Sequence, residues 1–319
     1  MLSPVLLPQG ANAKPSTGGT QLWVDRFNRS ASSDDYAYAL GVSPDGPMAY
    51  VTGTSTGGTG YDYATLAYAT ATGQRLWTSY YDGPANQEDI AFALEVSPEG
   101  SNVFVTGESV GSDNVDYATV AYDAATGTQL WVARYNGPGN AGDEAFSVAV
   151  SPGGGVVVVT GLSYASQFKV GYATAAYDSA TGKQLWLRRY DGPAGGNQAL
   201  AVAVSPGGGM AFVTGESYVA AKDAYDYATV AYDTFTGRQL WVARYKGPVG
   251  SDNVARALDV SPDGATLYVT GESIGADGDW DYATVAYDPA TGQQLWVTRV
   301  RDRLQHLVEW RIRLRNVGI

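Results

Sequence analysis

Hydrophobic and polar residues alternate along most of the chain with the period of a β-strand. In residues 89–97, two alanines alternate with Phe92, Leu94 and Val96. Strict alternation over this length predicts a strand whose two faces differ, here with small residues on one face. Similar short runs are separated by Gly, Pro and Asp, which favour tight turns. The pattern therefore predicts an all-β chain of short antiparallel strands.

The alternating segments belong to a repeat of about 55 residues. A Leu-Trp pair marks each repeat, and successive tryptophans lie 54 or 55 residues apart: Trp23, Trp77, Trp131, Trp186, Trp241 and Trp296. Ser-Pro turns and Thr-Gly pairs that end Val-rich runs keep the same step. Self-similarity at such a period is typical of solenoids, propellers and other repeat arrays.

Each repeat is long enough for four strands. In the second repeat we expect them at residues 89–97, 102–106, 116–122 and 129–135. Four antiparallel strands per repeat, without helices, predict a β-propeller in which each repeat is one blade. Five complete blades are expected, with an additional strand at residues 21–27. We expect the first strand of each blade to be innermost and the periodic tryptophans to pack between blades. Closure of the five blades into a ring is favoured over membership of a longer array.

Several motifs within the repeat resemble known propeller families. Residues 121–131, AYDAATGTQLW, have the Asp, the Thr-Gly pair and the Trp at the spacing found in pyrroloquinoline-quinone-type repeats. The order DYATVAYD, LW, Ser-Pro and VTG also resembles the bacterial propeller repeat called SBBP. The resemblance covers about residues 21–300. It implies a propeller and, for the non-catalytic relatives, an exported or envelope scaffold. Quinoprotein dehydrogenases usually carry an adjacent cysteine pair, whereas this chain has no cysteine.

Composition narrows the function classes. Among 319 residues there is no cysteine and one histidine, His306, so thiol nucleophiles and a Ser-His-Asp triad in the propeller are excluded. The net charge of −12 argues against a nucleic-acid partner. No apolar run reaches the 18 residues of a membrane-spanning helix, so we expect no transmembrane segment. We expect an extracellular or cell-envelope location.

The two ends of the chain differ from the repeats. Residues 1–20 are interpreted as an N-terminal segment that resembles a truncated signal peptide, with a small-residue cleavage site at residues 11–13. Residues 301–319 contain five arginines and two acidic residues. This basic tail is interpreted either as an amphipathic surface helix or as a stretch without an evolved role. The propeller is assigned to residues 21–300.

The candidate ligand face lies where the loops vary. Connections between the second and third strands of each repeat differ in length and composition, and variable loops on a rigid scaffold commonly bind ligands. Two columns of polar residues approach this face: Asp35, Asp89, Asp143, Asn197 and Asn253 in the first, and Glu108, Glu216 and Glu272 in the second. Arg256 and Trp280 break the repeat symmetry. The acids are interpreted either as a Ca²⁺ site or as loop caps.

These features predict a non-catalytic binding or scaffold protein that meets a protein or glycan partner through the variable loops. No catalytic residue is assigned, and no cofactor is expected, with Ca²⁺ as the one candidate. A carboxylate-dependent glycoside hydrolase is the alternative, because such chemistry needs two suitably spaced carboxyl groups. A pyrroloquinoline-quinone-dependent oxidoreductase is a further alternative.

Overall fold

The computed structural model describes residues 19–30, 34–166 and 169–300, and these residues form twenty strands in five four-stranded sheets. In every sheet, four strands that are consecutive in the chain pair with their neighbours in antiparallel order. This confirms the prediction of an all-β protein with five complete blades. The segments predicted at residues 1–20 and 301–319 lie almost wholly outside the described residues.

The strand bounds follow the repeat. The first two blades contain β1 (Asp35–Val42), β2 (Met48–Thr56), β3 (Tyr61–Ala69), β4 (Arg75–Tyr81), β5 (Asp89–Val96), β6 (Asn102–Val110), β7 (Val115–Asp123) and β8 (Gln129–Tyr135). The third contains β9 (Asp143–Val150), β10 (Val156–Ser166), β11 (Lys169–Asp178) and β12 (Gln184–Tyr190). The last two contain β13 (Asn197–Val204), β14 (Met210–Val219), β15 (Ala224–Asp233), β16 (Gln239–Tyr245), β17 (Asn253–Val260), β18 (Leu267–Ile274), β19 (Trp280–Tyr287) and β20 (Gln294–Val300).

The repeated Val-Thr-Gly motif has a steric explanation. In the second blade, the register of β5 against β6 shifts between Ala91 and Ala93, and Gly107 pairs with Ala91 at this irregularity. A Cβ atom on Gly107 would lie 1.9 Å from the backbone oxygen of Ile90, so no other residue fits. The irregularity recurs in the first pair of strands of every blade. Glycine therefore allows a close backbone approach that bends each inner strand.

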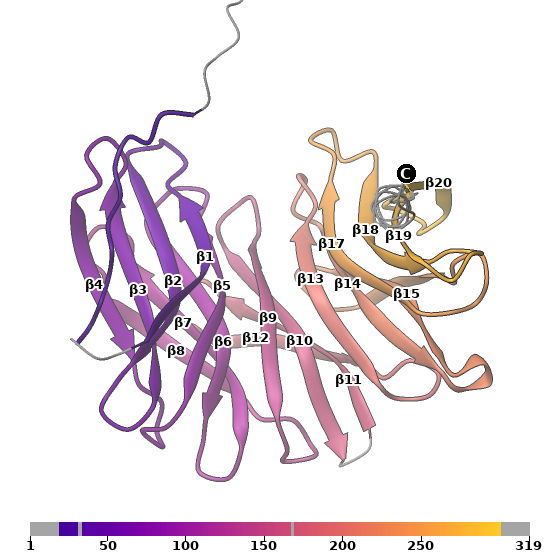
Figure 1. Ribbon diagram of the computed structural model, residues 1–319, viewed down its shortest axis with the longest axis horizontal. Coiled ribbons are helices and arrows are strands. Elements are labelled where there is room, and N and C mark those ends of the chain that lie inside the picture. The colour runs from indigo at the N-terminus through magenta and orange to yellow at the C-terminus, as the bar shows by residue number, and fades with distance from the viewer. Residues whose placement is uncertain (1–18, 31–33, 167–168, 301–319) are drawn as a thin grey trace, which may run out of the picture.

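The blades are arranged side by side as an open arc (Figure 1). The first strands of successive blades, β1, β5, β9, β13 and β17, contact one another in order, which places them on the inside as predicted. In Figure 1 the first blade lies at the left and the fifth at the right. Among the described residues, no comparably extensive contact joins these two blades. The favoured closure of five blades into a ring is therefore not what the structure shows.

Three hydrogen bonds repeat between neighbouring blades. The indole of Trp186 donates to the backbone oxygen of Thr234 in the next blade at 2.8 Å. The hydroxyl of Tyr172 donates to the backbone oxygen of Ala228 at 3.1 Å. In the reverse direction, a guanidinium in each of the second, third and fourth blades donates to a tyrosine hydroxyl of the preceding blade, through Arg134, Arg189 and Arg244. The buried indole and hydroxyl of Trp186 and Tyr172 thus have partners across the interface.

The N-terminal segment differs from its prediction in one respect. Residues 19–28 are not hydrogen-bonded as a strand. Even so, Trp23 donates to the backbone oxygen of Thr70 at 2.8 Å and packs on Tyr68, just as Trp77 donates to that of Ala124 and packs on Tyr122 one blade later. The segment therefore occupies the place that the fourth strand of a preceding blade would take against the first blade, without three strands of its own to pair with.

Trp186→Ala is expected to lower the free energy of unfolding by about 3–5 kcal/mol, because the indole is only 5% exposed and its removal leaves both a cavity and an unpaired carbonyl. Phe235→Ala is the matched control, since this ring is 62% exposed and should contribute within about 0.5 kcal/mol. Urea denaturation measures both. Equal effects of the two substitutions would contradict the structural role assigned to Trp186.

Candidate functional site

The first polar column ties loops together at the variable-loop face. One carboxylate oxygen of Asp143 accepts from the backbone N–H of Gly137 at 2.5 Å, and the other accepts from that of Tyr164 at 3.1 Å. Asp89 accepts from Gly83 at 2.7 Å in the same way. Asn197 accepts from the Ser217 hydroxyl at 2.5 Å, and Asn253 forms the corresponding bond with Ser273. These side chains hold the connection before β5, β9, β13 and β17, and a ligand role for them stays a prediction.

The second column lies beside the inner strands. Glu272, on β18, accepts from the guanidinium of Arg256 at 3.0 Å. Burial raises the pKa of Glu216, and the positive charge of Arg256 partly opposes this rise. The residue that breaks the symmetry in β17 is thus placed among two acids of the predicted column. The positive charge of Arg256 thus stabilises the carboxylates of Glu216 and Glu272. Glu108, the member of this column in the second blade, has no such arginine in its ion pairs or among the causes of its pKa shift.

Glu108 is the counterpart of these acids in the second blade, on β6. Burial raises its pKa to about 7, and the nearby carboxylate of Glu144 adds to the rise. Glu144 lies in β9 of the next blade and was not among the predicted site residues. Its own pKa is also raised by burial. The two partly buried acids therefore lie close enough to repel one another, and neither belongs to an ion pair among the described residues. A proton on one of them relieves this repulsion.

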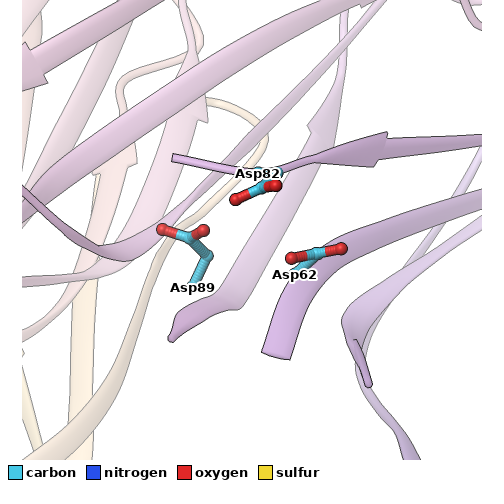
Figure 2. Close-up of side chains that lie close together, drawn as sticks. All are labelled: Asp62, Asp82 and Asp89. Atoms are coloured by element: carbon cyan, nitrogen blue, oxygen red, sulfur yellow. The ribbon is translucent and has the colours of Figure 1, made fainter. Parts of the chain in front are cut away.

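A second group of acids lies at the junction of the first two blades. Carboxylate oxygens of Asp62, Asp82 and Asp89 lie within 4.8 Å of one another, and Figure 2 shows the three side chains gathered around one space. Asp62 comes from β3, Asp82 follows β4 and Asp89 begins β5. Asp62 and Asp89 are buried, whereas Asp82 is exposed. Burial raises the pKa of Asp82 and of Asp89, and the charge of Asp62 adds to the rise for Asp82.

This acidic group exists because the repeat is broken once. In β8, β16 and β20 an arginine neutralises the aspartate of the adjacent strand, in the pairs Arg134–Asp116, Arg244–Asp226 and Arg299–Asp281. The equivalent residue of β4 is Tyr80. Asp62 is instead paired with Arg29 of the N-terminal segment, whose guanidinium also lies 4.0 Å from the centre of the Tyr80 ring. The replacement of arginine at position 80 is the sequence signal that could have located this group.

The oxygen atoms of Asp62, Asp82 and Asp89 are a donor set of the kind that suits Ca²⁺. However, Arg29 already supplies one positive charge to Asp62, and Gly83 supplies a backbone donor to Asp89. The three acids differ from the predicted Ca²⁺ candidates, with which they share only Asp89. A bound cation at either place stays a prediction.

Aromatic side chains also lie near the variable loops. Trp280, at the start of β19, is 49% exposed. Tyr218 packs against Tyr225 with ring centres 5.4 Å apart, and its hydroxyl donates to Asp223 at 2.7 Å. Tyr218 lies near the end of β14 and Tyr225 near the start of β15, so both rings lie on the same face as the two columns. The face combines exposed aromatic area with acids.

The family of the chain follows from its sequence. A family model described as outer membrane protein assembly factor BamB matches residues 12–201 and 171–314, which is most of the chain. The chain belongs to the BamB family. None of the curated protein sequences matches the chain.

Solved structures similar to this chain are also propellers. Kuenenia stuttgartiensis hydrazine synthase is 13% identical, with 89% of this chain and 83% of that chain covered and a TM-score of 0.53. The Dos1 propeller is 15% identical, with 84% and 59% covered and a TM-score of 0.53. BamB from Moraxella catarrhalis is 19% identical, with a TM-score of 0.48, and this BamB-family chain spans 65% of its length and aligns over 84% of its own. At these identities the likeness to hydrazine synthase and to the Dos1 propeller shows the fold alone.

Arg29→Ala is expected to destabilise this BamB-family protein by about 1–3 kcal/mol at pH 7, because Asp62 loses its ion-pair partner and Asp82 loses a nearby positive charge. Burial already raises the pKa of Asp82 and Asp89, so both bind protons more readily when folded. The loss relative to wild type should therefore shrink as pH falls toward 4. Thermal unfolding from pH 4 to pH 8 measures this. Arg26→Ala, at an exposed arginine of the same segment, should show no such pH dependence.

Glu108→Gln is expected to raise the melting temperature above pH 7 and to change it little below pH 4.5. The folded protein holds a proton on Glu108 up to about pH 7, so wild-type stability falls as pH rises from 4.5 through 7. A neutral glutamine removes that loss, and after allowance for solvent screening the gain is about 1–2 kcal/mol. Glu99→Gln, in an exposed turn, is the control. A gain that does not change with pH would contradict the interpretation.

Proposed function

We propose that the protein is a non-catalytic scaffold of the cell envelope that binds a protein partner through its variable-loop face. The observation that carries the proposal is the use of the polar columns within the fold. Asp89 and Asp143 hold loop amides, and Glu272 pairs with Arg256. Residues that serve the same structural bond in successive blades are poorly suited to a single catalytic constellation. The variable side chains on this face include the exposed Trp280 and the half-buried Tyr218 and Tyr225, and aromatic side chains are enriched at protein interfaces.

Membership of the BamB family supports the choice of a protein partner and of the envelope. The family description names an outer membrane protein assembly factor. No helix among the described residues is long and apolar enough to cross a membrane. The proposed scaffold therefore meets its partner with a rigid face of loops, and Tyr218, Tyr225 and Trp280 supply its apolar anchors.

A carboxylate-dependent hydrolase is the second candidate, and one observation favours it. Glu108 has a pKa of about 7 beside Glu144, which suits a group that donates and accepts a proton near neutral pH. Against this, Glu108 lies at a position where Glu216 and Glu272 recur in later blades, and in the fifth blade Arg256 neutralises Glu272. The Glu108→Gln protein distinguishes the two. A hydrolase acting on a panel of chromogenic glycosides would lose its turnover, whereas a scaffold has none to lose.

Site-specific photo-crosslinking in bacterial cells tests the scaffold. A photoreactive phenylalanine replaces Tyr218 on the variable-loop face and, as the matched control, Phe235 in the turn before β16 at the opposite end of the blade. The expected result is a discrete adduct with one envelope protein from position 218 and none from position 235, identified by mass spectrometry. The same adducts from both positions, or none from position 218, would contradict binding through this face.

A further inference from the structure

The far face of the fifth blade is an interface without its partner among the described residues. Tyr282 is 68% exposed, whereas its four counterparts, Tyr63, Tyr117, Tyr172 and Tyr227, are fully buried against the next blade. Trp296 is 45% exposed, compared with 5% for Trp186. The hydroxyls and indoles of these counterparts all donate to backbone oxygens of the following blade. The fifth blade therefore presents the donor half of a repeated contact.

The outer face of the first blade is the complementary half. Leu40 is 66% exposed, whereas the equivalent Leu94, Val148 and Val202 are 6–8% exposed. A cavity of about 340 Å³ opens beside it, lined mainly by apolar side chains that include Phe27 and Leu66. Backbone oxygens of Ala64 and Thr70 occupy the positions that accept from Tyr and Trp in each internal interface. An exposed apolar area of this kind indicates an interaction surface.

One part of this acceptor face is already occupied. Residues 21–27 read QLWVDRF, and β20 reads QLWVTRV. Because the two segments are so alike, Trp23 makes the bond to Thr70 that a tryptophan of a preceding blade would make. The N-terminal segment thus covers only the part of this face where the fourth strand of a preceding blade would pack. The surface around Leu40 and Tyr36 stays exposed.

We propose that a second copy of this chain docks head to tail, with the fifth blade of one copy against the first blade of the next. Trp296 replaces the partner copy's own Trp23 at the carbonyl of Thr70, and Tyr282 donates to that of Ala64. The argument is continuity, since the same contact already joins the blades four times within one chain. Such an interface is heterologous, so it builds rings or open chains of copies rather than an isolated two-fold dimer.

The charge of the molecule sets the expected salt dependence. Each copy has a net charge of −12, so long-range repulsion opposes association. The contact itself is apolar. Association should therefore strengthen when the ionic strength rises and the Debye length shortens.

Sedimentation velocity of the full chain, from 1 to 200 µM and at low and high salt, tests the proposal. Larger species are expected to grow with concentration and with salt. Two chemically identical substitutions should act in opposite directions: Trp296→Ala removes the docking side chain and should weaken association at least ten-fold. Trp23→Ala exposes the carbonyl of Thr70 and should strengthen association several-fold. Phe235→Ala, an exposed aromatic away from both faces, should leave it unchanged.

The outcomes are distinct. A single monomeric species at every concentration and salt would overturn the proposal. Association that Trp296→Ala leaves unchanged would place the contact on another surface and would also overturn it. Weakening by Trp23→Ala to the same extent as by Trp296→Ala would contradict the replacement of Trp23 by Trp296 at Thr70, and would overturn the proposed contact as well. Circular dichroism verifies that both variants are folded, since Trp296 is half exposed and Trp23 lies outside the strands.

Discussion

The structure depends on the indole hydrogen bond that joins one blade to the next. Trp131, for example, packs on Phe104 of its own blade and on Tyr177 of the next, and its N–H reaches the carbonyl of Ser179. A single blade cannot bury both faces of its sheet, so each one needs a neighbour on either side. The free energy of folding is therefore shared among nearest neighbours, as in other repeat proteins. The first and fifth blades each lack one such neighbour among the described residues.

A structure built on one repeated contact leaves little room for unique chemistry. Where the repeat is kept, an arginine of the fourth strand, a serine of the second and an aspartate of the third satisfy one another, as Arg134, Ser109 and Asp116 do. The local electrostatics differ where a charged residue is lost from the repeat or added to it. Tyr80 takes the place of the arginine in the first blade, and three carboxylates gather there. Arg256 adds a charge in the fifth blade, and it forms an ion pair with Glu272.

Most of the fold could be predicted from the sequence because its signals are local and repeated. Alternation of small and large residues identified the inner strands, and glycine and proline marked the turns that separate them. The second strand of each blade was expected to be short, at residues 102–106, yet β6 extends to Val110. The extension includes Glu108 and Ser109, which are polar but pair with β7 in regular register. Polar residues at the end of a strand resemble those of a loop, so the sequence pattern does not show where strand pairing ends.

What the sequence could not predict is how neighbouring elements are placed over longer distances. Whether five blades close depends on a small rotation added at each interface, and no residue type encodes that angle. The acidic group of Asp62, Asp82 and Asp89 combines residues from two blades, so alternation within a single strand does not reveal it. The N-terminal segment shows the same principle. Its sequence is that of a strand, but a strand needs a hydrogen-bonding neighbour, and residues 19–28 have only a face to pack against. Side-chain contacts such as that of Trp23 can therefore form where backbone pairing does not.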